Sequence, residues 1–341
     1  MRRLLTFLFL FPPLFASKTF SLGVKTLELF DEERQHPVLI ECWYPTDATQ
    51  TDSAVEPRED VEKWKEIWVL PEQIRDAAVS DQQERYPLLL LSHGNCGFRA
   101  EQSWFAEKMV QKGYIVAGVE HYGNTWEVYD HTYVCRPWER PMDVRFALDF
   151  LLEASPFSSR ISLDQIGLCG YSLGGMTALL LAGGILSEQD MKDELLNRYS
   201  LPEFLLDRFF LSLDREKTFS SFKDERIKSY LLFAPFANIF HPESLSGISA
   251  PMRVLYTLGD SVVPPYEHAL KLAREVKTAK VDALDFEAGH YVYLNKMTAS
   301  GREALPECMY EEHSNINQQE IFERIVQEAD LFFQTTLFTM P

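Results

Sequence analysis

The stretch QIGLCGYSLGGMTALLLA, residues 165–182, joins an apolar run to a helical run through GYSLG, in which Ser172 is the central residue. The first run has the length and apolar content of a strand buried on both faces, and the second has those of a buried helix. A Gly-x-Ser-x-Gly pattern at such a junction predicts a sharp turn, because glycines let the chain pack closely around a serine in a strained conformation. We therefore expect the Ser172 hydroxyl to point into a site at the end of the strand. An ordinary glycine-rich turn is the alternative.

Short apolar runs alternate with helical patterns along most of the chain, which predicts an α/β fold of one doubly wound domain. The apolar runs are residues 38–44, 86–92, 114–120, 165–171, 229–235, 252–258 and 281–287. The helical patterns span residues 100–112, 141–154, 173–184, 265–276 and 317–333. Strand-like runs rich in Val, Ile and Leu and separated by helices predict a mainly parallel sheet with helices on both faces.

Two stretches interrupt this alternation. Residues 47–85 are polar and charged and form a polar insertion, and residues 186–226 form a charged helical insertion after the helix that follows Ser172. Because ligands bind outside the carboxyl ends of the strands in such sheets, we expect 186–226 to be a small helical cap over a pocket. A pair of surface helices that does not contact a pocket is the alternative.

A serine hydroxyl is a weak nucleophile and needs a base, which an acid in turn orients. In a sheet of this kind the acid and the base follow the serine in that order along the chain. Asp260 follows the run MRVLYTL and His290 follows the run VDALDFE, so each lies where a strand is expected to end. We therefore predict a catalytic triad of Ser172, Asp260 and His290.

Such a triad also requires two backbone N–H donors for the oxygen that becomes negatively charged during attack. Leu173 supplies the first, because it follows the serine at the start of a helix. The second is expected from the turn SHGNCG, residues 92–97, and we favour the N–H of Asn95. His93 in this turn is predicted to hold the loop. His121 ends another strand and is either a substrate-binding residue of the pocket wall or a structural residue.

Composition limits the classes of partner and cofactor. The 341 residues are 46% hydrophobic and 25% charged, and the net charge of -18 disfavours nucleic acid, which binds to clusters of Lys and Arg. The His and Cys residues show none of the tight spacings of metal sites, so we expect no metal and no organic cofactor. The five cysteines are compatible with one disulfide, between Cys135 and Cys308, in an oxidising compartment.

The N-terminus predicts export. A positively charged start, MRR, precedes a short apolar run and small residues near position 16, which is the pattern of a signal peptide over residues 1–16. An uncleaved anchor or a buried strand is the alternative. No other segment approaches the roughly 20 apolar residues that cross a bilayer. We expect residues 17–341 to form one α/β-type domain without a membrane span, located in the periplasm or outside the cell.

Seven motifs make the chain resemble the secreted dienelactone-hydrolase-like esterases that include the platelet-activating-factor acetylhydrolases. They are CWYPT (42–46), LLLSHGNCGFR (89–99), GYIVAGVEHYGNT (113–125), RPMDVRFALDFL (140–151), ISLDQIGLCGYSLGG (161–175), GDSVVPP (259–265) and EAGHY (287–291). The resemblance implies an α/β-hydrolase fold. It assigns the nucleophile, the acid, the base and the two N–H donors, in that order, to Ser172, Asp260, His290, Asn95 and Leu173.

The sequence also departs from that family. Tyr171 stands where many members have His before the serine, and the two insertions are expected to reshape the pocket. Namesake dienelactone hydrolases use a cysteine nucleophile, which argues against dienelactone activity here. The resemblance implies a serine carboxylic-ester hydrolase that forms an acyl-enzyme with short-chain or phospholipid-like acyl esters, small molecules in either case. A serine amidase or peptidase would use the same triad, and a catalytically inactive binding protein would share the fold.

Overall fold

The computed structural model describes residues 20–49, 58–199, 202–285, 287–309 and 316–338. The signal peptide predicted for residues 1–16 therefore lies outside the described residues. Within them, the strands form one sheet in the order β3-β1-β2-β5-β4-β6-β7-β8-β9. The strands are β1 (Ser21–Asp31), β2 (His36–Thr46), β3 (Ile74–Arg75), β4 (Tyr86–Ser92), β5 (Ile115–Val119), β6 (Ile161–Tyr171), β7 (Ser229–Phe233), β8 (Met252–Thr257) and β9 (Ala279–Asp285).

Helices fill most of the connections between these strands. They are α1 (Glu59–Ile67), α2 (Ser103–Gln111), α3 (His131–Val134), α4 (Glu139–Glu153), α5 (Leu173–Ala182), α6 (Glu188–Tyr199), α7 (Glu203–Ser212), α8 (Arg215–Thr218), α9 (Pro242–Ser246), α10 (Ala269–Glu275), α11 (Ala299–Ala304) and α12 (Gln318–Leu337), with 3-10 turns η2 (Ser158–Arg160), η3 (His290–Tyr293) and η4 (Glu307–Met309). None of the helices in the described part of the chain has both the length and the apolar content to cross a bilayer.

The sheet is mainly parallel, as the sequence predicts. The strands from β5 through β4, β6, β7 and β8 to β9 pair in parallel, whereas β1 and β2 form an antiparallel hairpin and β2 pairs antiparallel with β5. The sequence did not predict β1. Several of its side chains are exposed or half-buried, so its sequence lacks the continuous apolar run of the central strands.

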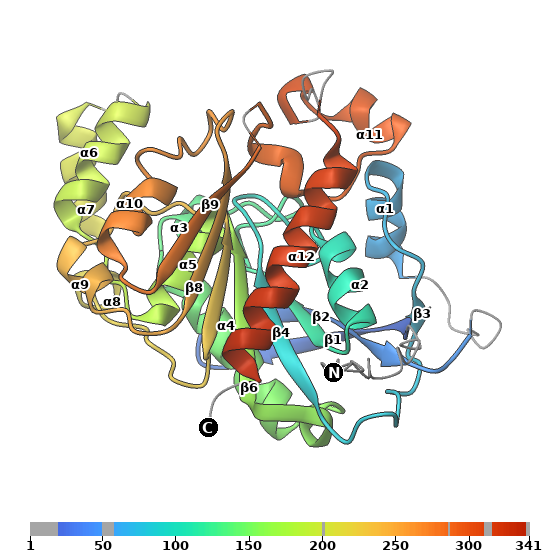
Figure 1. The fold of residues 1–341 in the computed structure, drawn as a ribbon. Coiled ribbons are helices and arrows are strands. Elements are labelled where there is room, and N and C mark those ends of the chain that lie inside the picture. The colour runs from blue at the N-terminus through green and yellow to red at the C-terminus, as the bar shows by residue number, and fades with distance from the viewer. Residues whose placement is uncertain (1–19, 50–57, 200–201, 286, 310–315, 339–341) are drawn as a thin grey trace, which may run out of the picture.

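Helices cover both faces of the sheet. Apolar residues of α2 and α12 pack on one face, and those of α4, α5, α9 and α10 pack on the other. Figure 1 shows α12 crossing in front of the strands with α2 beside it. Because both faces are covered, side chains of the central strands are buried whichever way they point, and all seven residues of β4 are buried.

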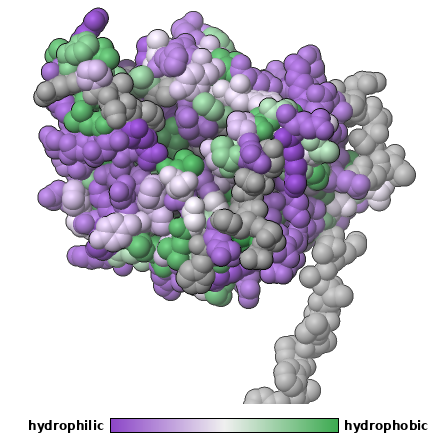
Figure 2. Space-filling model, turned by 90° about the horizontal axis from the view of Figure 1, so that it is seen from above, coloured by the Kyte–Doolittle hydropathy of each residue, from purple (hydrophilic) through white to green (hydrophobic). Residues whose placement is uncertain are grey.

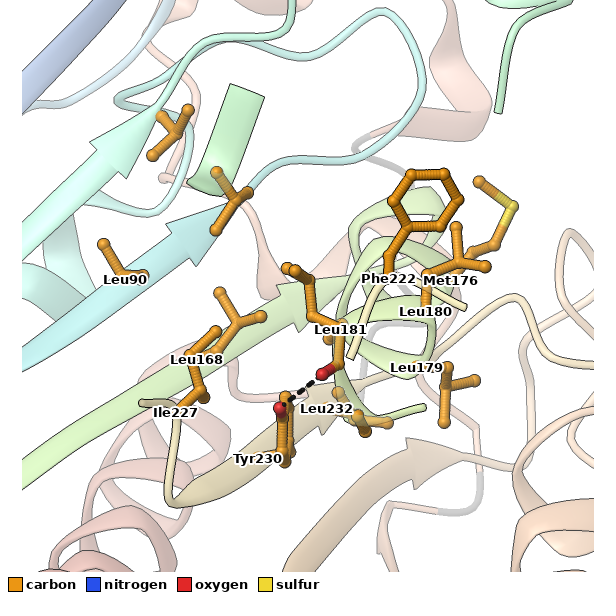
Figure 3. Packing of buried hydrophobic residues seen from close by; sticks show 14 of the residues in the cluster. Leu90, Leu168, Met176, Leu179, Leu180, Leu181, Phe222, Ile227, Tyr230 and Leu232 are labelled. Carbon is orange, nitrogen blue, oxygen red and sulfur yellow. Dashed lines mark hydrogen bonds between the residues drawn. The ribbon is translucent and has the colours of Figure 1, made fainter. Parts of the chain in front are cut away.

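The helix α5 packs closely behind the strands that bear the site. Figure 3 shows Leu179, Leu180 and Leu181 of α5 in one apolar cluster with residues of β6 and β7. The Tyr230 hydroxyl of β7 donates to the Leu181 carbonyl at 2.9 Å. Burying a leucine side chain stabilises a fold by about 1.5–3 kcal/mol. These contacts therefore fix α5, and with it the turn in which α5 begins.

The two insertions occupy different sides of the molecule. Residues 58–85 of the first carry α1 and β3, and α1 buries Val61 and Trp64. The second carries α6, α7 and α8 and is helical, as predicted; α6 and α7 lie beside α10 at the left of Figure 1. Figure 2 looks down on the molecule and shows a largely hydrophilic surface with apolar groups in separate clusters.

Candidate active site

Ser172 lies at the sharp turn between β6 and α5. Its backbone has φ 54° and ψ -115°, a conformation that residues other than glycine rarely adopt. A Cβ at Gly174 would lie 1.9 Å from the Ser92 carbonyl oxygen, and a Cβ at Gly170 would lie 2.3 Å from that of Gly174. Both positions therefore require glycine. The pattern read from the sequence forms the predicted strand-to-helix turn and leaves the Ser172 side chain facing a pocket.

The structure brings the three predicted triad residues together. His290 Nε2 lies 2.9 Å from Ser172 Oγ, and His290 Nδ1 lies 2.7 Å from Asp260 Oδ2. These distances suit a hydroxyl that donates to Nε2 and an Nδ1–H that donates to the carboxylate. The residues are 118 and 30 positions apart in the chain, and all three are less than 10% exposed.

Asp260 is fixed on its other side by the backbone. Its Oδ1 accepts hydrogen bonds from the amides of Val262 at 2.9 Å and Val263 at 2.7 Å. Because the loop after β8 holds Oδ1, Oδ2 remains directed at the imidazole of His290. The carboxylate thus fixes both the tautomer and the orientation of the ring.

Tyr171 supports His290, a role that the sequence analysis did not predict. The Tyr171 hydroxyl donates to the backbone carbonyl of His290 at 3.0 Å, and the two rings are tilted against each other with centroids 5.1 Å apart. The sequence signal was present, because Tyr171 directly precedes Ser172 in the turn. Its partner became visible only when β6 and η3 were placed side by side.

The turn after β4 presents the backbone amide of Asn95, the second predicted donor to the oxyanion. The Gly97 amide donates to the Gly94 carbonyl at 3.3 Å, so Asn95 and Cys96 are the central residues of a tight turn, and Cys96 has φ 54°. Asn95 borders the same pocket as Ser172. Among the described residues, the amides of Asn95 and Leu173 have no protein acceptor. Both are free to donate to a bound oxygen.

Glu101 holds this turn from behind. Its Oε1 accepts a hydrogen bond from the Gly94 amide at 2.7 Å, and a Cβ at Gly97 would lie 2.1 Å from its Oε2. Burial raises the pKa of Glu101 to about 8. The side chain is therefore mostly uncharged at neutral pH, and it does not place a full negative charge beside the oxygen that the turn would stabilise.

The two histidines near the turn are structural. His93 Nδ1 donates to the Gly94 carbonyl at 2.8 Å, and its Nε2 accepts from the His121 amide at 3.1 Å. This agrees with the prediction that His93 holds the loop. His121 is 1% exposed and does not border the pocket. Its Nε2 lies 2.8 Å from Ser92 Oγ, and its Nδ1 lies 3.1 Å from Asp143 Oδ2. The structure favours the structural interpretation of His121 over the substrate-binding one.

The pocket in front of Ser172 has a volume of about 390 Å³. Ser172, His290 and Asn95 border it together with a mainly apolar and aromatic wall: Trp68, Phe98, Trp126, Tyr291, Leu294, Leu305 and Met309. No described residue of 186–226 lines it, so the expected cap does not form this wall. The polar insertion contributes Trp68, and the segment after His290 contributes most of the rest.

A larger groove of about 670 Å³ lies between α2 and α12, away from the triad. It contains none of the predicted site residues. Because the chemistry requires a nucleophile, a base and N–H donors around one point, we place the candidate active site in the smaller pocket.

The disulfide considered for Cys135 and Cys308 is not formed. Both cysteines are free and exposed. Cys135 follows α3, where Tyr133 packs against His36, whereas Cys308 lies in η4 near Tyr291 at the pocket. The two loops thus belong to different parts of the fold, a separation that the sequence does not reveal.

Solved structures identify the architecture. The structure of ferulic acid esterase from Streptomyces cinnamoneus matches with a TM-score of 0.64 over 96% of this chain and 92% of that chain, at 19% sequence identity. The chain has the α/β-hydrolase fold. The fold class predicted from the sequence is therefore confirmed, including the mainly parallel sheet with helices on both faces.

A family model also matches part of the chain. Residues 70–142 match the family described as platelet-activating factor acetylhydrolase, isoform II. The match confirms the resemblance to that family, and it contains the turn with Asn95 but ends before Ser172. No curated protein matches the sequence significantly. Both names, that of the family and that of the solved structure, are names of ester hydrolases.

Proposed function

We propose that this α/β hydrolase is a serine carboxylic-ester hydrolase that works through an acyl-enzyme. The observation that carries the proposal is the continuous set of contacts from Ser172 Oγ through His290 to Asp260 at the edge of an apolar pocket. The ester-hydrolase names of the matching family and of the similar structure support it.

In the first half of the reaction, Ser172 Oγ attacks the carbonyl carbon while His290 Nε2 takes the hydroxyl proton. The carbonyl oxygen becomes negatively charged and accepts hydrogen bonds from the amides of Asn95 and Leu173. As the tetrahedral intermediate collapses, the bond to the alkoxy oxygen breaks and His290 donates its proton to the leaving alcohol. The acyl group remains bonded to Ser172.

In the second half, His290 takes a proton from a water molecule whose oxygen attacks the acyl carbon. The bond to Ser172 Oγ breaks, the serine regains its proton from His290, and the carboxylic acid leaves. Throughout both halves Asp260 accepts the Nδ1–H and stabilises the imidazolium that forms.

The pocket favours compact apolar groups. Its volume of about 390 Å³ and its aromatic wall fit a short or ring-containing acyl group, and a long acyl chain would extend into solvent. Short-chain esters, and phospholipid-like esters with a short acyl group, are the proposed substrates. We also propose that the enzyme acts in the periplasm or outside the cell, because residues 1–16 have the pattern of a signal peptide.

The test is hydrolysis of p-nitrophenyl esters from acetate to dodecanoate by the purified protein and by its Ser172→Ala variant. We expect the highest kcat/KM on the short esters, and labelling by a fluorophosphonate that is absent in the variant. Faster cleavage of an acetyl anilide than of the acetyl ester would identify an amidase instead. Well-folded protein with neither labelling nor turnover would identify a binding protein and refute the proposal.

A further inference from the structure

The first turns of α4 bury charged side chains. Glu139, Arg140 and Asp143 are 9%, 5% and 1% exposed, although a helix packed on a sheet usually presents apolar residues. Burying a charge is costly unless hydrogen bonds compensate for the lost water. The contacts of Arg140 show what this burial achieves, because they lead to both sides of the predicted oxyanion site.

Arg140 binds three uncharged acceptors. Its guanidinium donates to the backbone carbonyl of His93, to Asn124 Oδ1 at 2.8 Å and to Thr177 Oγ1 at 3.0 Å. Among the described residues Arg140 forms no ion pair, although the carboxyl groups of Asp143 and Glu101 are near enough to act on its pKa. Burial lowers the pKa of Arg140 to about 9, so the side chain still carries its positive charge at neutral pH.

One set of these contacts reaches the Asn95 turn. The His93 carbonyl lies two residues before Asn95, and Asn124 Nδ2 donates to Asn95 Oδ1 at 2.9 Å. Arg140 therefore fixes the backbone before the turn directly and the Asn95 side chain through Asn124.

The other contact reaches the start of α5. Thr177 accepts from Arg140 and donates through its own hydroxyl to the carbonyl of Leu173 at 3.2 Å. Leu173 is the residue whose amide is the second proposed donor. The guanidinium of Arg140 thus connects, through no more than one intervening side chain, to the two residues whose amides would bind the oxyanion.

We propose that Arg140 is a positioning residue of the oxyanion site: it holds the Asn95 turn and the first turn of α5 at a fixed separation and places a buried positive charge behind both. This inference rests on the ester-hydrolase function proposed above. The spacing of the two amides matters most when the oxygen becomes an anion, so Arg140 acts mainly on the transition state.

The test compares Arg140→Gln and Arg140→Lys with the wild type. Removing one oxyanion donor typically lowers kcat about 10²- to 10³-fold, so we expect Arg140→Gln to lower kcat by about 10²-fold with KM changed less than about threefold. Arg140→Lys retains the charge but not the three-way geometry, and should recover part of the loss. A trifluoromethyl ketone, which forms an oxyanion on the serine, should bind Arg140→Gln more weakly by a similar factor.

Arg160→Gln is the matched control. Arg160 also donates to two backbone carbonyls, those of Ser80 and Gln83, but it lies before β6, at the opposite end of that strand from Ser172. Its substitution removes contacts to backbone carbonyls together with an ion pair to Asp81 at 2.7 Å, and should lower the melting temperature without changing kcat. This control separates a general loss of stability from a loss of oxyanion geometry.

Asn124→Ala provides a second route to the same question. It breaks the link to Asn95 while keeping Arg140, and we expect a smaller loss of kcat, about tenfold, with KM nearly unchanged. Should Arg140→Gln fail to fold, this variant decides: a lowered kcat supports the proposal, and a kcat equal to that of Arg160→Gln overturns it.

The proposal is also overturned if folded Arg140→Gln has a kcat within about threefold of the Arg160→Gln value. Such a result leaves the proposed function intact, since wild-type hydrolysis of p-nitrophenyl acetate and fluorophosphonate labelling test that function separately. Absence of both in the wild type would refute the function itself.

Discussion

Two sets of Ser, His and Asp residues with nearly the same contacts lie in this molecule. In the pocket set, His290 is 2.9 Å from Ser172 and 2.7 Å from Asp260. In the buried set, which consists of Ser92, His121 and Asp143, the corresponding distances are 2.8 Å and 3.1 Å. Hydrogen-bond geometry alone therefore does not distinguish a candidate catalytic triad from a structural one.

The two sets differ in access and in backbone conformation. Ser92 ends a regular strand and is completely buried, whereas Ser172 stands at a strained turn beside the pocket. Burial also lowers the pKa of His121 well below its usual range, so this ring resists taking up a proton. A general base must be able to gain a proton, and a nucleophile must reach a substrate. The buried set fails both conditions, whereas Ser172 of the pocket set borders the pocket.

The largest effect is expected from Ser172→Ala. Removing the nucleophile of a serine hydrolase lowers kcat by about 10⁶-fold, and fluorophosphonate labelling should disappear completely. Labelling and kcat/KM on p-nitrophenyl acetate measure both effects. If the variant kept its labelling, the reactive serine would lie elsewhere and the distinction between the two sets would fail.

The next largest effect is expected from Asp260→Asn. The amide cannot accept the Nδ1–H in the same way, which favours the wrong tautomer of His290, and kcat should fall by about 10⁴-fold. The matched change in the buried set, Asp143→Asn, should lower kcat far less. Steady-state kinetics of the two purified variants checks this, and equal losses in both would contradict the assignment of roles.

A moderate effect on stability is expected from Ser92→Ala. The change removes the hydroxyl partner of His121 Nε2, and an unsatisfied buried group costs about 1–3 kcal/mol of the free energy of unfolding. Labelling should persist and kcat should stay within about tenfold of the wild type. Urea denaturation and labelling measure the two effects. Loss of labelling in folded protein would show that the buried set takes part in the reaction.

The last prediction concerns stability alone, namely its pH dependence through Glu101. Its pKa is about 8 in the folded protein against an ordinary value of 4.5, so the folded state binds more protons between these values. The free energy of unfolding of the wild type should therefore fall, relative to that of Glu101→Gln, as the pH rises from about 5 to about 8. Above that range the difference should stay constant. Urea denaturation at several pH values measures it, and a difference independent of pH would contradict the raised pKa.

Much of the pocket set was predictable because its signals are local. Ser172 lies in a five-residue pattern between a strand and a helix, and Asp260 and His290 each follow an apolar run. The carboxyl ends of parallel strands lie along one edge of a sheet, so residues at those positions converge. The prediction needed the strand pattern and the order along the chain, but no knowledge of packing.

The rest of the site was not predictable in this way. The contacts of Tyr171 with His290 and of Arg140 with Asn124 join segments whose spacing carries no pattern. A buried arginine in RPMDVR looks like any charged residue at the start of a helix until the helix is packed. The placement of residues 186–226 was not predictable either, since loop position along the chain does not fix where a loop folds. None of its described residues lines the pocket, but Arg198 donates to the carbonyl of Val262, which does.

The sequence by itself determined the fold class, the strained turn at Ser172 and the order in which the acid and the base follow it. These depend on apolar periodicity and on glycine, which act over a few residues. The tertiary structure alone decided which side chains wall the pocket, which of two similar Ser-His-Asp sets faces it, and what the buried charges of α4 hold in place. Those outcomes depend on burial and on partners far apart in the chain, which exist only after the layers have packed.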